Sequence, residues 1–219
     1  MFLRLLLACL LLLLAAAPPA QAGAWPRGKG NHFAFAALRA IGSETGELTP
    51  SFSYYHEYGL TDHLTVSADL GGAISGFDKT VVALSMPLPL PEFLGLKAGV
   101  QLGYGEIAGQ QVMRPGLSLG RGFAHPQGWA SVDLVAEIFP ELLAIDWKVD
   151  LTLGVTSQRG HKYYLQWQTG QQMGDPVFSR LEGSVAWQLR DGLFLDVGAA
   201  AGLAATDPYR VKLGLWREF

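Results

Sequence analysis

The chain has 219 residues, of which 49% are hydrophobic and 16% charged, with 27 glycines and a formal net charge of −3. A slightly acidic chain of this kind is not expected to bind nucleic acid, which requires a basic surface. Its one cysteine, Cys9, lies in an apolar N-terminal run, so we expect no disulfide, thiolate nucleophile or thiolate metal site in the rest of the chain.

The first 22 residues have the three parts of a secretory signal peptide. These are the positively charged Arg4, an apolar run at residues 5–17, and a small-residue cleavage site at Ala20-Gln21-Ala22. The apolar run is shorter than the roughly 20 residues that a spanning helix needs. We therefore predict a signal peptide over residues 1–22 that is cleaved on export.

A glycine-rich stretch at residues 23–31 is predicted to be a flexible periplasmic lead-in. From residue 32 onward, apolar and polar residues alternate in segments of about ten residues, separated by turns rich in Gly, Pro and Asp. Membrane strands need about 9–11 residues, whereas strands of soluble sheets usually have about 5–6. We predict an all-β fold over residues 32–219, a single antiparallel up-and-down transmembrane barrel of about 12 strands. The predicted strands are 32–41, 50–59, 64–73, 80–88, 96–106, 112–123, 129–138, 144–156, 162–171, 177–189, 194–203 and 209–219.

The last of these segments has a regular alternation that ends on an aromatic residue. Its apolar face carries Tyr209, Val211, Leu213, Leu215 and Phe219. This pattern resembles the closing strand of Gram-negative outer-membrane β-barrels, in which the terminal Phe and the alternating apolar positions are what the insertion machinery reads. The resemblance implies an outer-membrane location, contact with its lipid, and recognition by the barrel-assembly machinery. Arg217 departs from the pattern, which has an apolar residue there.

A second resemblance lies at residues 55–70, where strand, Gly-Leu-Thr-Asp turn and strand are similar to hairpins of outer-membrane transporters of the phenol meta-pathway type. A secreted soluble β-sandwich also has one apolar and one polar face, and it is the alternative fold. Aromatic residues near strand ends favour the membrane barrel, because they form girdles at both interfaces. They are Phe33, Tyr58, Phe123, Trp129, Tyr163, Trp187, Tyr209 and Phe219.

Nearly all charges within the strands fall on the face opposite to the apolar one, and we predict that they line the lumen. The predicted lumen residues are Glu57, Asp69, Lys97, Arg114, Asp133, Glu137, Asp146, Lys148, Asp150, Arg180, Glu182, Asp196, Arg210 and Lys212. Small residues concentrate on the fifth, sixth and eleventh strands, and charges on the seventh, eighth and tenth. This predicts one smooth wall and one charged wall, with Lys148 paired to Asp146 and Asp150.

Barrel width grows with strand number: about 8 strands enclose a lumen that side chains fill, and 16–18 leave an open channel. Twelve strands predict a narrow passive channel for small hydrophilic solutes. The alternative is a non-conducting structural or partner-docking barrel whose lumen is filled by salt bridges. Charges of both signs argue against a strong ion filter, which uses a ring of one sign.

A lipid-modifying outer-membrane enzyme is the third possibility. The five histidines, His32, His56, His63, His125 and His161, gather near one rim without a neighbouring serine or an evident third partner. We therefore predict no catalytic residue, and the same spacing predicts no metal site and no cofactor.

Overall fold

The structure, a computed structural model, describes residues 26–219, and the predicted signal peptide lies outside them. The described chain forms twelve strands and a short 3-10 helix, η1 (Glu92–Leu94). The strands are β1 (His32–Gly42), β2 (Leu48–Gly59), β3 (Thr65–Ala73), β4 (Lys79–Leu88), β5 (Lys97–Ile107), β6 (Gln110–Ala124), β7 (Gln127–Phe139), β8 (Ala144–Thr156), β9 (Lys162–Gln171), β10 (Phe178–Arg190), β11 (Leu193–Ala204) and β12 (Tyr209–Glu218). Within residues 26–219, no helix is long and apolar enough to cross a membrane.

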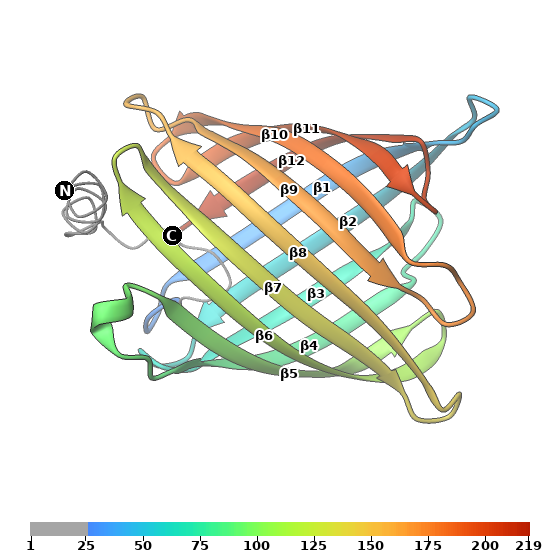
Figure 1. Ribbon diagram of the computed structural model, residues 1–219, viewed down its shortest axis with the longest axis horizontal. Helices are drawn as coiled ribbons and strands as arrows, with labels where there is room; N and C mark the ends of the chain where they lie inside the picture. Colours follow the sequence, from blue (N-terminus) through green and yellow to red (C-terminus); the bar gives the residue numbers. More distant parts are fainter. Residues whose placement is uncertain (1–25) are drawn as a thin grey trace, which may run out of the picture.

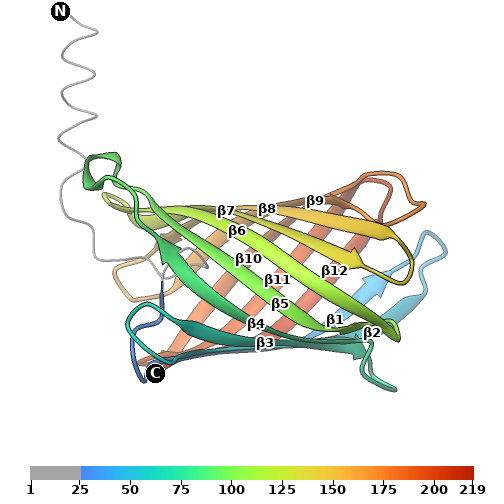
Figure 2. The ribbon, with the colours of Figure 1, turned by 90° about the horizontal axis from the view of Figure 1, so that it is seen from below.

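Each strand pairs antiparallel with its neighbours in the chain, and β1 also pairs with β12, so the sheet closes into a barrel (Figure 1). The closing register places Phe33 opposite Glu218 and Gly42 opposite Tyr209. Figure 2 shows the strands tilted across the wall, as closure of a sheet requires. The predicted twelve-stranded barrel is confirmed, and the open sandwich is excluded. Closure matters in a bilayer because no backbone N–H or C=O group is left at a sheet edge.

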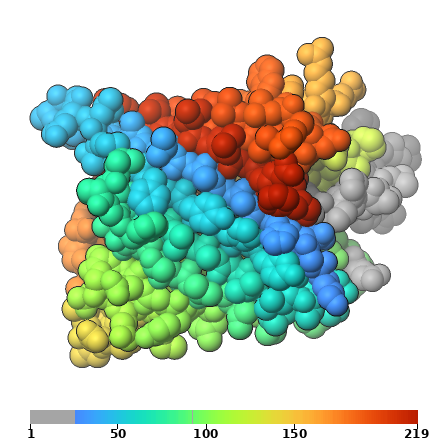
Figure 3. All heavy atoms as spheres, turned by 180° about the vertical axis from the view of Figure 1, so that it is seen from behind, coloured from blue at the N-terminus to red at the C-terminus, as the bar shows by residue number. Residues whose placement is uncertain are grey.

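The outward face carries the apolar side chains that alternate along each strand. On β12, Val211, Leu213 and Leu215 are 48%, 54% and 50% exposed. The outer surface is continuous where the red β12 meets the blue β1 (Figure 3). An apolar surface of this extent is unfavourable in water, and it fits the hydrocarbon layer of a membrane.

The two ends of the described barrel meet at one rim, which in bacterial barrels is the periplasmic end. The backbone N–H of Phe219 donates to the carbonyl of His32 at 3.0 Å, and the two rings lie 5.6 Å apart. Tyr58 extends this aromatic group, with its ring 4.6 Å from that of His32. The guanidinium of Arg217 lies 4.5 Å from the centre of the Phe219 ring. Arg217 can depart from the apolar pattern because a charged group at the rim reaches the polar interface.

Two of the predicted girdle aromatics lie inside the barrel. Trp129 is 8% exposed and lines the interior, and Phe33 packs against Trp216 at 5.5 Å. Their placement follows from register, because both lie on the side of their strands that carries the charges. The prediction of an outward position for these two residues is wrong. Phe33 joins Phe35, Phe194 and Trp216 in an aromatic cluster inside the periplasmic end of the lumen, and the Trp129 ring lies 6.4 Å from that of Tyr164, which packs against the same cluster.

Candidate functional site: the barrel lumen

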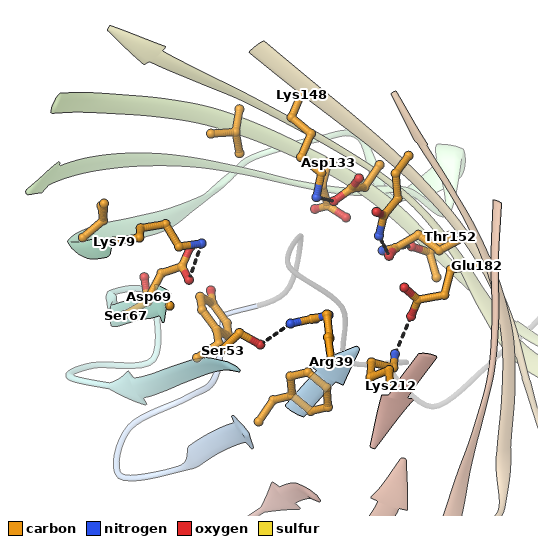
Figure 4. A pocket seen from close by; sticks show the side chains of 18 of the residues that line it. Arg39, Ser53, Ser67, Asp69, Lys79, Asp133, Lys148, Thr152, Glu182 and Lys212 are labelled. Atoms are coloured by element: carbon orange, nitrogen blue, oxygen red, sulfur yellow. Dashed lines mark hydrogen bonds and ion pairs between the residues drawn. The ribbon is translucent and has the colours of Figure 1, made fainter. Parts of the chain in front are cut away.

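A cavity of about 920 Å³ occupies the interior and is lined by residues from all twelve strands. Its lining extends from Arg27 and Trp216 near the periplasmic end to Thr49 and Ala108 near the other end. Figure 4 shows its charged and hydroxyl side chains pointing inward from strands on opposite sides of the barrel. Successive side chains of a strand point to opposite faces of the sheet, so the residues next to these inward groups point outward, and most of them are apolar.

The structure places most of the predicted lumen residues around this cavity. Three do not contribute to its lining: Lys97 is exposed at the start of β5, Glu137 contacts Arg114 at 3.5 Å, and Asp146 accepts a hydrogen bond from the backbone N–H of Met173 at 2.7 Å. The eleven that do are Glu57, Asp69, Arg114, Asp133, Lys148, Asp150, Arg180, Glu182, Asp196, Arg210 and Lys212.

The first of the charged clusters is centred on Asp69. Lys79 Nζ lies 2.8 Å from Asp69 Oδ1, and Arg114 Nη1 lies 2.5 Å from Asp69 Oδ2. Arg114 extends from β6 across β5 and β4 to β3, and Gly103 on β5 leaves room for it: a Cβ on Gly103 would lie 3.3 Å from the Arg114 Cβ. The small residues of β5 therefore accommodate charged side chains of other strands.

A second cluster surrounds Lys212 on β12. Its Nζ lies 2.5 Å from Glu182 Oε1 and 3.2 Å from Asp196 Oδ2. The Tyr164 hydroxyl donates to Asp196 Oδ2 at 2.6 Å and accepts from Lys212 Nζ at 3.0 Å. These charges are deeply buried, with side-chain exposures of 6% for Lys212, 10% for Glu182 and 0% for Asp196. One ammonium thus holds two carboxylates together across three strands.

A third group joins β7 and β8. Lys148 Nζ contacts Asp150 Oδ2 at 2.8 Å, as predicted, whereas the predicted contact with Asp146 is absent from the ion pairs of residues 26–219. Asp133 is the cross-strand partner of Asp150 and accepts hydrogen bonds from Ser118 and Ser131 at 2.6 and 3.2 Å. Hydroxyl donors therefore satisfy a carboxylate that has a like charge beside it.

The charges surround the lumen and do not form one wall. Asp69 lies on β3, Arg114 on β6 and Asp196 on β11, all outside the predicted charged strands. The prediction of separate smooth and charged walls is wrong. The physical reason is that long side chains cross over the small residues of adjacent strands, which sequence periodicity along single strands does not reveal.

The segment before β1 enters the periplasmic mouth. Arg27 is 7% exposed, forms an ion pair with Glu57, and has its guanidinium 4.4 Å from the centre of the Phe33 ring. Tyr55 donates to the same carboxylate of Glu57 at 2.5 Å. The backbone N–H of Arg27 donates to Thr65 Oγ1 at 3.2 Å. The predicted lead-in therefore contacts the barrel at Arg27, whose side chain lines the lumen.

Gly59 on β2 allows the segment before β1 to pack closely against the barrel. A Cβ on Gly59 would lie 1.8 Å from the carbonyl oxygen of Gly28, so only glycine fits. The backbone N–H of Gly30 donates to the Gly59 carbonyl, and that of Gly59 donates to Asn31. Arg27 was not among the predicted lumen residues because it lies outside any strand pattern. The only signal was a basic residue between Pro26 and Gly28, two positions before Lys29.

Replacing Arg27 with alanine is expected to raise the unit conductance of the barrel in planar bilayers. The guanidinium occupies the periplasmic mouth, and its removal widens that mouth and leaves the carboxylate of Glu57 with the Tyr55 hydroxyl as a donor but without its cation. The matched control is Lys29→Ala, because the Lys29 side chain is exposed outside the mouth. An unchanged conductance in Arg27→Ala would contradict a restricting role for this residue.

The histidine group near the rim lies on the lipid side of the wall. His32 Nδ1 lies 3.2 Å from His56 Nε2, and the Tyr54 hydroxyl lies 2.8 Å from His56 Nδ1. His161 instead stacks on Trp187 at 4.5 Å. Among the residues that the structure describes, no three His, Cys, Asp or Glu side chains are arranged to hold a metal ion.

Comparison with known proteins finds likeness in structure alone. No protein-family model matches the sequence, and no curated protein matches it. The KdgM porin in complex with disordered oligogalacturonate is similar with a TM-score of 0.62 at 10% identity, over 84% of this chain and 99% of the porin. The NanC porin is similar with a TM-score of 0.66 at 7% identity, over 86% of this chain and 100% of the porin. An outer-membrane channel from Pseudomonas putida F1 is similar with a TM-score of 0.56 at 13% identity, over 92% of this chain and 100% of the channel. The chain therefore has the fold of small outer-membrane porins and channels.

Proposed function

We propose that the protein is a passive channel for small hydrophilic solutes in the outer membrane of a Gram-negative bacterium. The observation that carries this proposal is the cavity of about 920 Å³, whose lining extends from one end of the barrel to the other and carries charged and polar side chains among apolar ones. Water and small polar solutes can exchange hydrogen bonds with such a lining as they pass. Its narrowness follows from the strand number, because twelve strands enclose less space than the 16–18 of open porins.

The outward face supports the proposed location. Its apolar side chains would contact outer-membrane lipid, and Tyr209, Val211, Leu213, Leu215 and Phe219 would present the closing strand to the barrel-assembly machinery. All five are at least 41% exposed on the outer surface. The contacts that recognition needs are therefore available on the folded strand. No catalytic role is proposed for the histidines, since the side-chain hydrogen bonds of the His32–His56 pair within residues 26–219 join them to each other and to Tyr54, without a serine or a carboxylate.

Reconstitution into planar lipid bilayers tests the channel. We expect unitary currents in KCl, lowered by Gln166→Trp, because Gln166 lines the cavity and an indole would narrow it. Leu165→Trp is the matched control, since the adjacent Leu165 side chain is 47% exposed on the outer face. Absence of unitary current at any voltage would remove the channel proposal.

The second candidate is a non-conducting barrel that braces the membrane or docks a partner through its short connections. It is favoured by the three ion-pair clusters and by Arg27 in the periplasmic mouth, because paired charges inside a barrel fix register. The two functions differ in one measurement: a structural barrel with a filled lumen carries no current even after Arg27→Ala.

A further inference from the structure

Arg180 differs from most other basic residues of the lumen because it forms no ion pair with a carboxylate among residues 26–219. It lies on β10, lines the cavity, and has its Nε and Nη1 atoms buried without a hydrogen-bond partner among residues 26–219. A guanidinium in this state is costly, because charged donors removed from water lose hydration that nothing replaces. The cost falls when an anion supplies the missing acceptors.

Each carboxylate around Arg180 has one oxygen paired with another cation, and the second oxygen of Asp150 is buried without a hydrogen-bond partner among residues 26–219. Asp150, Glu182 and Asp207 are close enough to attract it electrostatically. Asp150 contacts Lys148 at 2.8 Å, Glu182 contacts Lys212 at 2.5 Å, and Asp207 contacts Arg210 at 2.5 Å. None of them forms an ion pair with Arg180 in the described part of the chain. Arg210 is a like charge close enough to repel it, and so adds to the positive potential at this point.

Arg39 provides a second open guanidinium on β1. It donates a hydrogen bond to Ser53 Oγ and forms no ion pair with a carboxylate within the described residues. Its side chain points into the lumen near Lys212 and Glu182 (Figure 4). Glu182 is within electrostatic reach of both Arg39 and Arg180. The two open guanidiniums therefore face the same region of the cavity, on strands separated by β11 and β12.

The geometry at Arg180 suits a planar anion. Its guanidinium carbon lies 4.7 Å from the centre of the Phe178 ring, which holds the group against the wall. Gln168, its direct cross-strand partner on β9, adds an amide to the lining. A carboxylate accepts two parallel hydrogen bonds from one guanidinium, a geometry that a spherical anion such as chloride cannot match.

We propose that Arg180, assisted by Arg39, forms a binding site for small organic carboxylates inside the lumen. The role of this site in passage rests on the proposed channel function. If the barrel is a channel, small organic carboxylates are the class of solute that it favours. Binding itself requires only the folded barrel. Among residues 26–219, the other basic side chains that line the lumen form ion pairs with carboxylates, whereas Arg180 and Arg39 form none.

Saturation-transfer NMR on the detergent-solubilised protein tests the binding, with lactate as the probe at about 20 mM salt, where screening is weak. We expect transfer to lactate in the unmodified protein. Arg180→Gln should raise the Kd about tenfold, because it removes the charge-assisted hydrogen bonds. Arg180→Lys should give a smaller rise, since it keeps the charge and loses the bidentate geometry. Arg159→Gln is the matched control, because Arg159 is exposed in the β8–β9 turn.

Lactate added during bilayer recordings separates this inference from the channel proposal. Binding through Arg180 without any unitary current would refute the channel and leave the site standing. Currents that lactate does not reduce, with a Kd unchanged by Arg180→Gln, would refute the site and leave the channel standing. Absence of lactate binding to the unmodified protein would also overturn the site.

Discussion

Replacing Lys212 with methionine is expected to lower the free energy of unfolding by about 3–5 kcal/mol, as when one partner of a buried ion pair is removed. The change leaves Glu182 and Asp196 as two buried carboxylates without their shared cation. Asp196 has no solvent exposure, so it cannot recover hydration in place of the lost contact. Tyr164 also loses the ammonium that donates to its hydroxyl.

Urea unfolding in lipid vesicles, followed by tryptophan fluorescence, measures this loss. Lys79→Met is the matched control, because Lys79 is 31% exposed and its partner Asp69 keeps Arg114. It should cost less than about 1 kcal/mol, as partly solvated pairs do. A triple variant, Lys212→Met with Glu182→Gln and Asp196→Asn, should recover much of the stability, since no unpaired charge remains. Equal losses for Lys212→Met and Lys79→Met would contradict the assigned burial of the cluster.

Replacing Leu213 with arginine is expected to destabilise the barrel by about 2–4 kcal/mol, the cost of a cation on the lipid face near the bilayer midplane. Leu213 lies in the middle of β12 and is 54% exposed on the outer surface. Its flanking residues on the same face, Val211 and Leu215, offer no acceptor for the introduced charge. The guanidinium must then reach the interface by extending along the wall.

The control for this change is the same substitution at an outward residue near the end of the barrel. Leu48 is 55% exposed but begins β2, at the end of the barrel opposite Phe219. Leu48→Arg should cost only about 0–1 kcal/mol, as substitutions near the interface do. The same vesicle unfolding assay compares the two variants. Equal stability of Leu213→Arg and the unmodified protein would show that this face does not meet hydrocarbon.

Much of the architecture could be predicted because it depends on a period of two along each strand. The alternation on β12 placed Val211, Leu213 and Leu215 outward, and the structure agrees. Long segments and frequent turn residues predicted twelve strands and an up-and-down topology, which the pairing confirms. A side chain's face is a local property, since successive residues of a strand point to opposite sides whatever the rest of the fold does.

The arrangement inside the lumen was decided by the tertiary structure. Arg114 meets Asp69, a residue 45 positions away, because the curved sheet brings the side chains of β3 and β6 together across β4 and β5. Arg27 enters the mouth because Gly59 leaves room for the backbone of Gly28. Arg180 has no ion pair among the described residues because the neighbouring carboxylates, such as Asp150, are paired with other cations. The sequence by itself determined which side of the wall most residues occupy. Which charges meet depends on the distances across a closed barrel, and these exist only once all twelve strands have taken their register.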